Sequence, residues 1–133
     1  YGGSAWDAPH ITFHQPVSYE GELPYIYSSS VVNIDIPAFQ SIDSVNNRIF
    51  DAAGARSLIL TEAKSGLQRI CNDPDAIGYH SISDLVEKIR FYLENVSARD
   101  EVAEKLYVST CKDHTYRHRA EYVLDVLSEE GLS

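Results

Sequence analysis

Two short runs of strand-forming residues, with one helical segment between them, constrain this fold more than any other feature. Val31–Ile34 is the first run, and Ser57–Thr61 reads S-L-I-L-T, which is typical of a strand buried on both faces. The intervening stretch predicts a helix that is capped by Asp43 or Ser44 and ends near Gly54. Alternation of strand and helix indicates an α/β layer fold built on a parallel sheet.

The remaining patterns extend this alternation. A sheet of about four strands is expected, sandwiched by helices in a Rossmann-like three-layer α/β/α arrangement with a helical C-terminal tail. The other expected strands and helices before the tail are His10–Phe13, Tyr19–Ser29, Ser65–Ile70 and Ala76–Tyr79. The tail is expected to hold three helices that begin near Ser83, Ser97 and Thr115, the last with a stripe formed by Ala120, Val123, Leu124 and Leu127.

Length and charge exclude several classes of protein. The chain has 133 residues, enough for one domain with a core, and no apolar run approaches a membrane span. Its net charge of −9 argues against nucleic acid or an anionic membrane as a partner. No signal peptide is visible and the two cysteines form no C-x-x-C pair, so a cytoplasmic location is expected. The opening Tyr1 in place of Met indicates a fragment of a longer protein.

The predicted helix before Gly54 is the first candidate site. In open parallel sheets, ligands bind outside the carboxyl ends of the strands, and the loop after Val31–Ile34 leads from such an end to a helix N-terminus. The amides of Ser44, Val45 and Asn46 are expected to face an anion there. Asp51 would accept hydrogen bonds from the hydroxyls of a ribose. The alternative is an ordinary amphipathic helix with Asp51 on its solvated face.

The second unusual stretch is Asp113–Arg119, which reads D-H-T-Y-R-H-R. His114 and His118 share a helical face, but the nearby basic groups disfavour a cation, so no metal is expected. The alternative is the start of a helix, with Thr115 as its cap and Tyr116 packed inward.

The order of several motifs resembles the C-terminal domain of CgeB-like group 1 glycosyltransferases. The motifs are N-N-R-I-F-D-A-A-G-A, S-L-I-L-T-E, D-L-V-E-K-I-R-F-Y-L-E-N and D-H-T-Y-R-H-R-A, together with Gly3–Trp6. They occur in the same order and span nearly the whole chain. The resemblance implies the C-terminal half of a GT-B fold, in which residues 1–133 form one nucleotide-sugar-binding domain. The expected partners are a nucleoside-diphosphate sugar as donor substrate, an acceptor and a separate N-terminal domain, with no cofactor and no metal.

The resemblance also implies roles for individual residues. Asp43 and Asp51 stand at the two acidic positions of the family's E-x7-E arrangement, with Asp51 at the ribose. Ser44, Val45 and Asn46 stand in the loop that faces the diphosphate. The resemblance also implies that the backbone of Gln15, Pro16 and Val17 lies against the base of the nucleotide.

Two departures from the family pattern leave an alternative open. Both acids are Asp, one methylene shorter than Glu, and the basic Arg/Lys pair of related donor sites is not recognisable. A Rossmann-like binding or regulatory module that has lost donor binding is therefore the alternative function. A flavodoxin- or receiver-like domain is a further alternative, although a receiver needs an acidic cluster at its strand ends that the sequence does not display.

Overall fold

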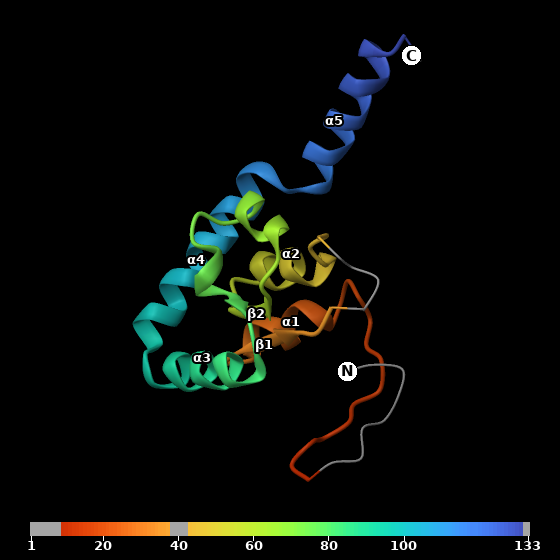
Figure 1. Cartoon of the computed structure of the whole chain (residues 1–133). Helices are drawn as coiled ribbons and strands as arrows, with labels where there is room; N and C mark the ends of the chain where they lie inside the picture. Colours follow the sequence, from red (N-terminus) through yellow and green to blue (C-terminus); the bar gives the residue numbers. More distant parts are fainter. Residues whose placement is uncertain (1–8, 38–42, 132–133) are drawn as a thin grey trace.

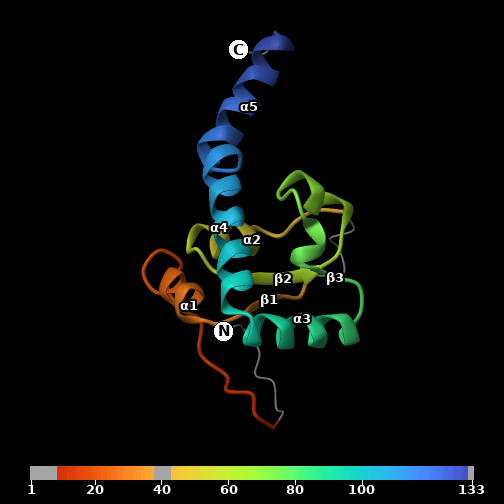
Figure 2. The same ribbon diagram turned by 90° about the vertical axis from the view of Figure 1, so that its left-hand side faces the viewer.

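A computed structural model describes residues 9–37 and 43–131, and these form a three-layer α/β structure (Figure 1). The sheet has three parallel strands in the order β1-β2-β3. One face is covered by helix α3 and the other by α2 and α4 (Figure 2). The strands are β1 (Asn33–Asp35), β2 (Ile59–Glu62) and β3 (Gly78–Tyr79). The predicted fold class, with its parallel sheet and helical C-terminal tail, is confirmed.

Five α-helices and two short 3-10 turns complete the described part of the chain. The α-helices are α1 (Leu23–Ser29), α2 (Asn47–Gly54), α3 (Ile82–Glu94), α4 (Val96–Asp113) and α5 (Tyr116–Glu129). The 3-10 turns are η1 (Ser65–Arg69) and η2 (Pro74–Ala76). None of the helices in the described ranges has the length and apolar composition needed to cross a bilayer.

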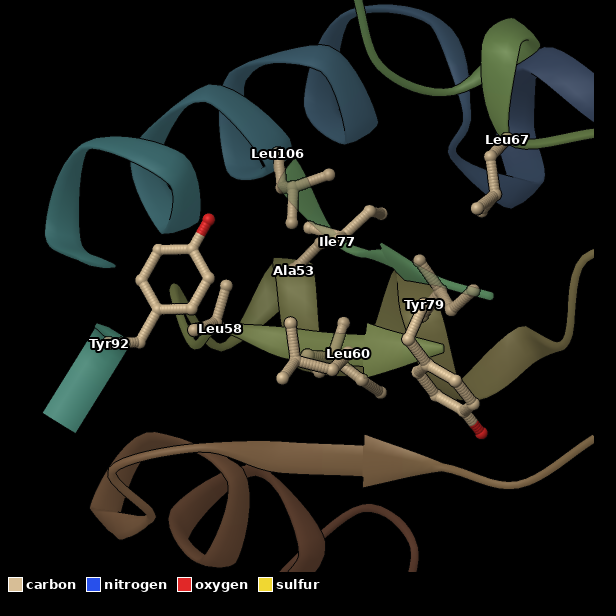
Figure 3. Close-up of a cluster of buried hydrophobic side chains, with 11 residues drawn as sticks. Ala53, Leu58, Leu60, Leu67, Ile77, Tyr79, Tyr92 and Leu106 are labelled. Atoms are coloured by element: carbon tan, nitrogen blue, oxygen red, sulfur yellow. The ribbon is translucent and has the colours of Figure 1, made fainter. Parts of the chain in front are cut away.

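The centre of the core is strand β2 together with the residue before it. Leu58, Ile59 and Leu60 are each no more than 2% exposed, so both faces of this strand are buried as the sequence predicted. Ala53 of α2 and Leu106 of α4 pack over one side of the strand (Figure 3). The small alanine side chain lets α2 approach the sheet closely, which sets the position of that helix.

Helix α2 begins two or three residues later than predicted, because its cap is Asn46 and not Ser44 or Asp43. Asn46 is its N-cap, and the Asn46 side chain accepts a hydrogen bond of 3.3 Å from the amide of Arg48. The predicted caps, Asp43 and Ser44, precede the helix, and Asp43 instead accepts a hydrogen bond from the Ser65 hydroxyl at 3.1 Å. Asparagine is among the strongest N-cap residues, so the helix starts where Asn46 can satisfy its first amides.

Several other boundaries also differ from the prediction. His10–Phe13 is not a strand, because no strand of the described sheet pairs with it and an unpaired strand is unstable in water. Helix α1 starts at Leu23 rather than Tyr19, since Pro24 suits a first helical turn. Helix α3 is capped by Ser81, whose hydroxyl accepts from the Asp84 amide, and not by Ser83.

The start of α5 confirms one prediction and contradicts another. Thr115 caps the helix through a reciprocal capping box with His118. Tyr116 was expected to pack inward but is 78% exposed. The helix extends away from the layered body (Figure 1), so the body offers little surface against which Tyr116 could be buried.

We expect opposite effects from alanine at two glycines near α2. A Cβ on Gly66 would lie 2.5 Å from the Asp43 carbonyl oxygen and 3.0 Å from a Val45 methyl, whereas a Cβ on Gly54 would meet nothing within 4 Å. Gly66→Ala should therefore destabilise the fold by about 1–3 kcal/mol. Gly54→Ala should stabilise it by up to about 1 kcal/mol, because alanine favours a helix. Urea unfolding monitored by circular dichroism measures both, and equal effects would contradict the packing described.

Candidate functional site

A buried carboxylate lies where the carboxyl ends of the strands meet the start of α2. Asp35 is the last residue of β1, and its exposed fraction is 0%. Its Oδ1 accepts hydrogen bonds from the Asn46 side-chain amide at 3.1 Å and from Nη1 of Arg48 at 3.3 Å. Its Oδ2 accepts one from the Thr61 hydroxyl at 3.3 Å. A buried charge is costly unless it is paired and hydrogen-bonded, and these three donors meet that requirement.

The fold itself brings these donors to Asp35. The register of the parallel pair β1–β2 places Asp35 beside Thr61. Asn46 caps α2, and Arg48 follows it in the first helical turn. From β3, the hydroxyl of Tyr79 donates to the backbone carbonyl of Asp35 at 3.3 Å. The end of β1 is therefore bonded to both other strands and to α2.

Arg48 presents a cation at this edge of the sheet. One of its nitrogens contacts Asp35, yet its side chain is 59% exposed, so part of the guanidinium faces solvent. It also lies at the N-terminal end of α2, where the helix dipole favours negative charge. Sequence reasoning identified no basic group for the site, and the structure places one here. An anion that contacts this turn of α2 would meet both the dipole and Arg48.

Asp51 lies one turn further along α2 and contacts the N-terminal segment. Its Oδ1 accepts a hydrogen bond of 2.5 Å from the hydroxyl of Tyr19. That hydrogen bond raises the pKa of Tyr19 above its ordinary value, and burial, the negative charge of Asp51 and the adjacent Tyr116 add to the shift. The carboxylate of Asp51 already accepts from one hydroxyl group, which is the interaction a ribose would offer.

The charges of Asp35, Arg48 and Asp51 all act on the hydroxyl of Tyr27 in α1. Burial is the largest cause that raises its pKa. The negative charges of Asp51 and Asp35 raise it further, and the positive charge of Arg48 lowers it. Arg48 contacts Asp35 at 3.3 Å and lies one helical turn before Asp51 on α2. We call these three charged residues, Asp35, Arg48 and Asp51, the α2 cluster.

The other predicted site residues are distributed around this cluster. Asp43 and Ser44 are exposed in the loop before α2, while Val45 is half-buried and packs against the core. Asn46 joins the loop to the cluster through its bond to Asp35. Asp43 precedes the helix, so only part of the eight-residue interval between Asp43 and Asp51 is helical.

The residues predicted to contact the base lie in the non-helical segment before α1. Gln15 and Pro16 are exposed, and Val17 is half-buried. Tyr19, two residues after Val17, ties this segment to Asp51. Gly3–Trp6, which contributed to the resemblance, lies outside the described residues.

Two concavities occur elsewhere on the described surface. One, of about 230 Å³, lies at the amino ends of β1 and β2 and is lined by Ser30, Arg56 and Arg99 among others. The second, of about 570 Å³, lies between α4 and the loop before β3 and is lined by Cys71 and Lys105 among others. Neither is lined by the α2 cluster. Across residues 9–37 and 43–131, no group of three His, Cys, Asp or Glu side chains is placed to hold a metal ion.

Comparison with protein families gives a match that covers most of the chain. The model of a family described as glycosyl transferase-like matches residues 1–125, which is most of the chain. No curated protein and no solved structure shows a significant match.

Two arginines at equivalent helical positions allow the buried ion pair to be tested. Arg48 and Arg117 are each the second residue of their helix, but Arg48 contacts the buried Asp35 and Arg117 contacts the exposed Glu121 at 2.8 Å. Arg48→Ala leaves a buried carboxylate without its cation and should lower the free energy of unfolding by about 2 kcal/mol. Arg117→Ala should cost no more than about 0.5 kcal/mol. Urea unfolding measures the free energy of unfolding of both variants. Equal losses would show that the ion pair with Arg48 does not stabilise the buried carboxylate of Asp35.

Proposed function

Because the chain belongs to the glycosyl transferase-like family, we propose that it is the donor-binding domain of a glycosyltransferase of the CgeB-like group. It would take part in the transfer of a sugar from a nucleoside-diphosphate sugar to an acceptor. The observation that carries the proposal is the α2 cluster, with an exposed cation beside a carboxylate at the carboxyl edge of a parallel sheet. This edge is where ligands bind in open α/β folds.

The proposed diphosphate position is the N-terminal turn of α2. The guanidinium of Arg48 and the positive end of the helix dipole would both act on the diphosphate there. Negative charge develops on the diphosphate as its bond to the anomeric carbon breaks, and fixed cations stabilise such charge most effectively. Asp35 is a positioning residue in this scheme, because it holds one nitrogen of Arg48 in place. The same position is bordered by the loop residues Ser44, Val45 and Asn46. The proposed mechanism requires no metal.

The proposed ribose position is Asp51. Arg48 and Asp51 are three residues apart on α2, so they share one face of the helix. The ribose and the diphosphate of a nucleotide are also neighbours, which matches that spacing. A ribose hydroxyl would replace the hydroxyl of Tyr19 on Asp51 or use the second carboxylate oxygen. Asp43 would lie toward the other end of the donor, and the backbone of Gln15–Val17 toward the base.

The proposed reaction is a displacement at the anomeric carbon of the donor. An acceptor oxygen forms a bond to that carbon, the bond to the diphosphate breaks, and the nucleoside diphosphate leaves with the electron pair. We expect the base that removes the acceptor proton to come from a separate N-terminal domain. The isolated chain should therefore bind nucleotide without transferring sugar.

The alternative function is a Rossmann-like binding or regulatory module that has lost donor binding. Two observations favour it. Asp51 is one methylene shorter than the family's Glu, and its Oδ1 is already bonded to Tyr19 at 2.5 Å.

Calorimetric titration of the chain with UDP, GDP, ADP and dTDP tests the proposal. We expect one of these diphosphates to bind, and Asp51→Ala to weaken that binding at least tenfold, which is about 1.4 kcal/mol. Arg48→Ala should weaken binding by a similar factor through the diphosphate, whereas Arg117→Ala should leave it unchanged because Arg117 lies outside the α2 cluster. The absence of binding to all four diphosphates would favour the alternative function.

Tyr19→Phe separates two roles of Asp51. If Asp51 binds the ribose, removal of the competing tyrosine hydroxyl should leave affinity unchanged or increase it. If Asp51 matters only because it anchors Tyr19, Tyr19→Phe should weaken binding as much as Asp51→Ala does. Circular dichroism of both variants checks that the fold is intact.

A further inference from the structure

Tyr19 contacts the carboxylate to which the proposed function assigns the ribose. Its hydroxyl donates a hydrogen bond of 2.5 Å to Oδ1 of Asp51, although the two residues are 32 positions apart in the sequence. This hydrogen bond is the largest influence on the pKa of Tyr19, which it raises above the ordinary value. Tyr19 is nevertheless 55% exposed, so burial restrains its side chain only in part. The contact with Asp51 therefore holds an otherwise exposed side chain beside α2.

The turn that carries Tyr19 is stabilised independently of Asp51. The Ser18 amide donates to Oε2 of Glu22 at 3.1 Å, and the Glu22 amide donates to the Ser18 hydroxyl at 3.2 Å. The amide of Leu23, the first residue of α1, donates to the Ser18 carbonyl at 3.1 Å. These bonds remain when the Tyr19 side chain rotates away from Asp51. Exposed side chains change rotamer in picoseconds to nanoseconds, so the contact can open without unfolding of the turn.

A ribose and Tyr19 would compete for the same oxygen of Asp51. A ribose presents two adjacent hydroxyls, and an ionised carboxylate accepts hydrogen bonds on both of its oxygens. A contact that uses both carboxylate oxygens of Asp51 would place one ribose hydroxyl where the Tyr19 hydroxyl lies in this structure. The Tyr19 side chain therefore has to leave Oδ1 before Asp51 can bind a ribose in this way.

Given the proposed role of Asp51 at the ribose, we propose that Tyr19 is a side-chain gate that closes the donor site in the free protein. In the closed state its hydroxyl occupies Oδ1 of Asp51, and in the open state the side chain lies in solvent. The apparent affinity for nucleotide is the intrinsic affinity multiplied by the open fraction of the protein. A charge-assisted hydrogen bond that favours the closed state about tenfold would therefore weaken nucleotide binding about tenfold.

Calorimetric titration of Tyr19 variants with UDP, GDP, ADP and dTDP tests the gate. Tyr19→Phe removes the hydroxyl that occupies Asp51, so this variant should bind the preferred diphosphate about tenfold more tightly than the wild type. Tyr19→Ala also removes the ring and should show at least the same gain. Tyr25→Phe is the matched control, because it removes a hydroxyl from a tyrosine of α1 that is 73% exposed, and it should leave the affinity unchanged.

The outcomes separate the gate from the proposed function. If the wild type binds a diphosphate and Tyr19→Phe binds it no more tightly, the gate is overturned and the donor site stands. If the wild type, Tyr19→Phe and Tyr19→Ala all fail to bind, both the gate and the proposed function are overturned. Binding by Tyr19→Phe alone would support the gate and would exclude the alternative function, in which donor binding has been lost.

Fluorine NMR of the chain labelled with 3-fluorotyrosine gives a second readout. The signal of Tyr19 is assigned by its loss in Tyr19→Phe. Saturating diphosphate should move this signal toward its position in the free Asp51→Ala variant, because both changes release Tyr19 from Asp51. A Tyr19 signal that stays in place while the diphosphate binds would overturn the gate.

Discussion

The buried carboxylate of Asp35 is the constraint on which the site and much of the fold depend. A charge that is fully removed from water must be compensated locally, and here the compensation comes from three side chains. Thr61 supplies it from β2, and Asn46 and Arg48 supply it from the cap and first turn of α2. The end of β1, the neighbouring strand and the start of α2 are therefore fixed relative to one another by a single side chain.

Helix α2 separates its apolar packing residues and its charged residues onto two faces. Ile49, Ala52 and Ala53 are buried in the core, and this face places the helix against β2 and α4. The opposite face carries Arg48 and Asp51, neither of which takes part in the apolar packing. Substitutions in the α2 cluster therefore act on charge and hydrogen bonding, while substitutions on the buried face act on packing volume.

The sequence predicted the features that local patterns determine. The buried strand through Leu60, the cap at Thr115 and the alternation of strand and helix follow from neighbouring residues. The role of Asp35 was missed because its donors lie 11, 13 and 26 residues away, so only the folded sheet brings them together. One signal was present: Asp35 is a charged residue within the run V-V-N-I-D-I, at the carboxyl end of a predicted strand. The predicted roles of Asp43, Asp51 and Gln15 stay predictions, because donor binding has to be measured.

An anion site in a chain with a net charge of −9 requires local control of the electric field. Charges separated by more than about 8–10 Å are largely screened at physiological salt, so distant acids contribute little at the start of α2. The groups that matter are Arg48 and the helix dipole, opposed by Asp35 and Asp51. Asp35 contacts Arg48 directly and neutralises part of its charge, while it keeps the remaining guanidinium surface in one place. The arrangement thus gives up some electrostatic attraction for a fixed geometry. Under the proposed function, the fixed cation of Arg48 and the carboxylate of Asp51 would together favour a ligand that carries both an anionic group and a neighbouring sugar.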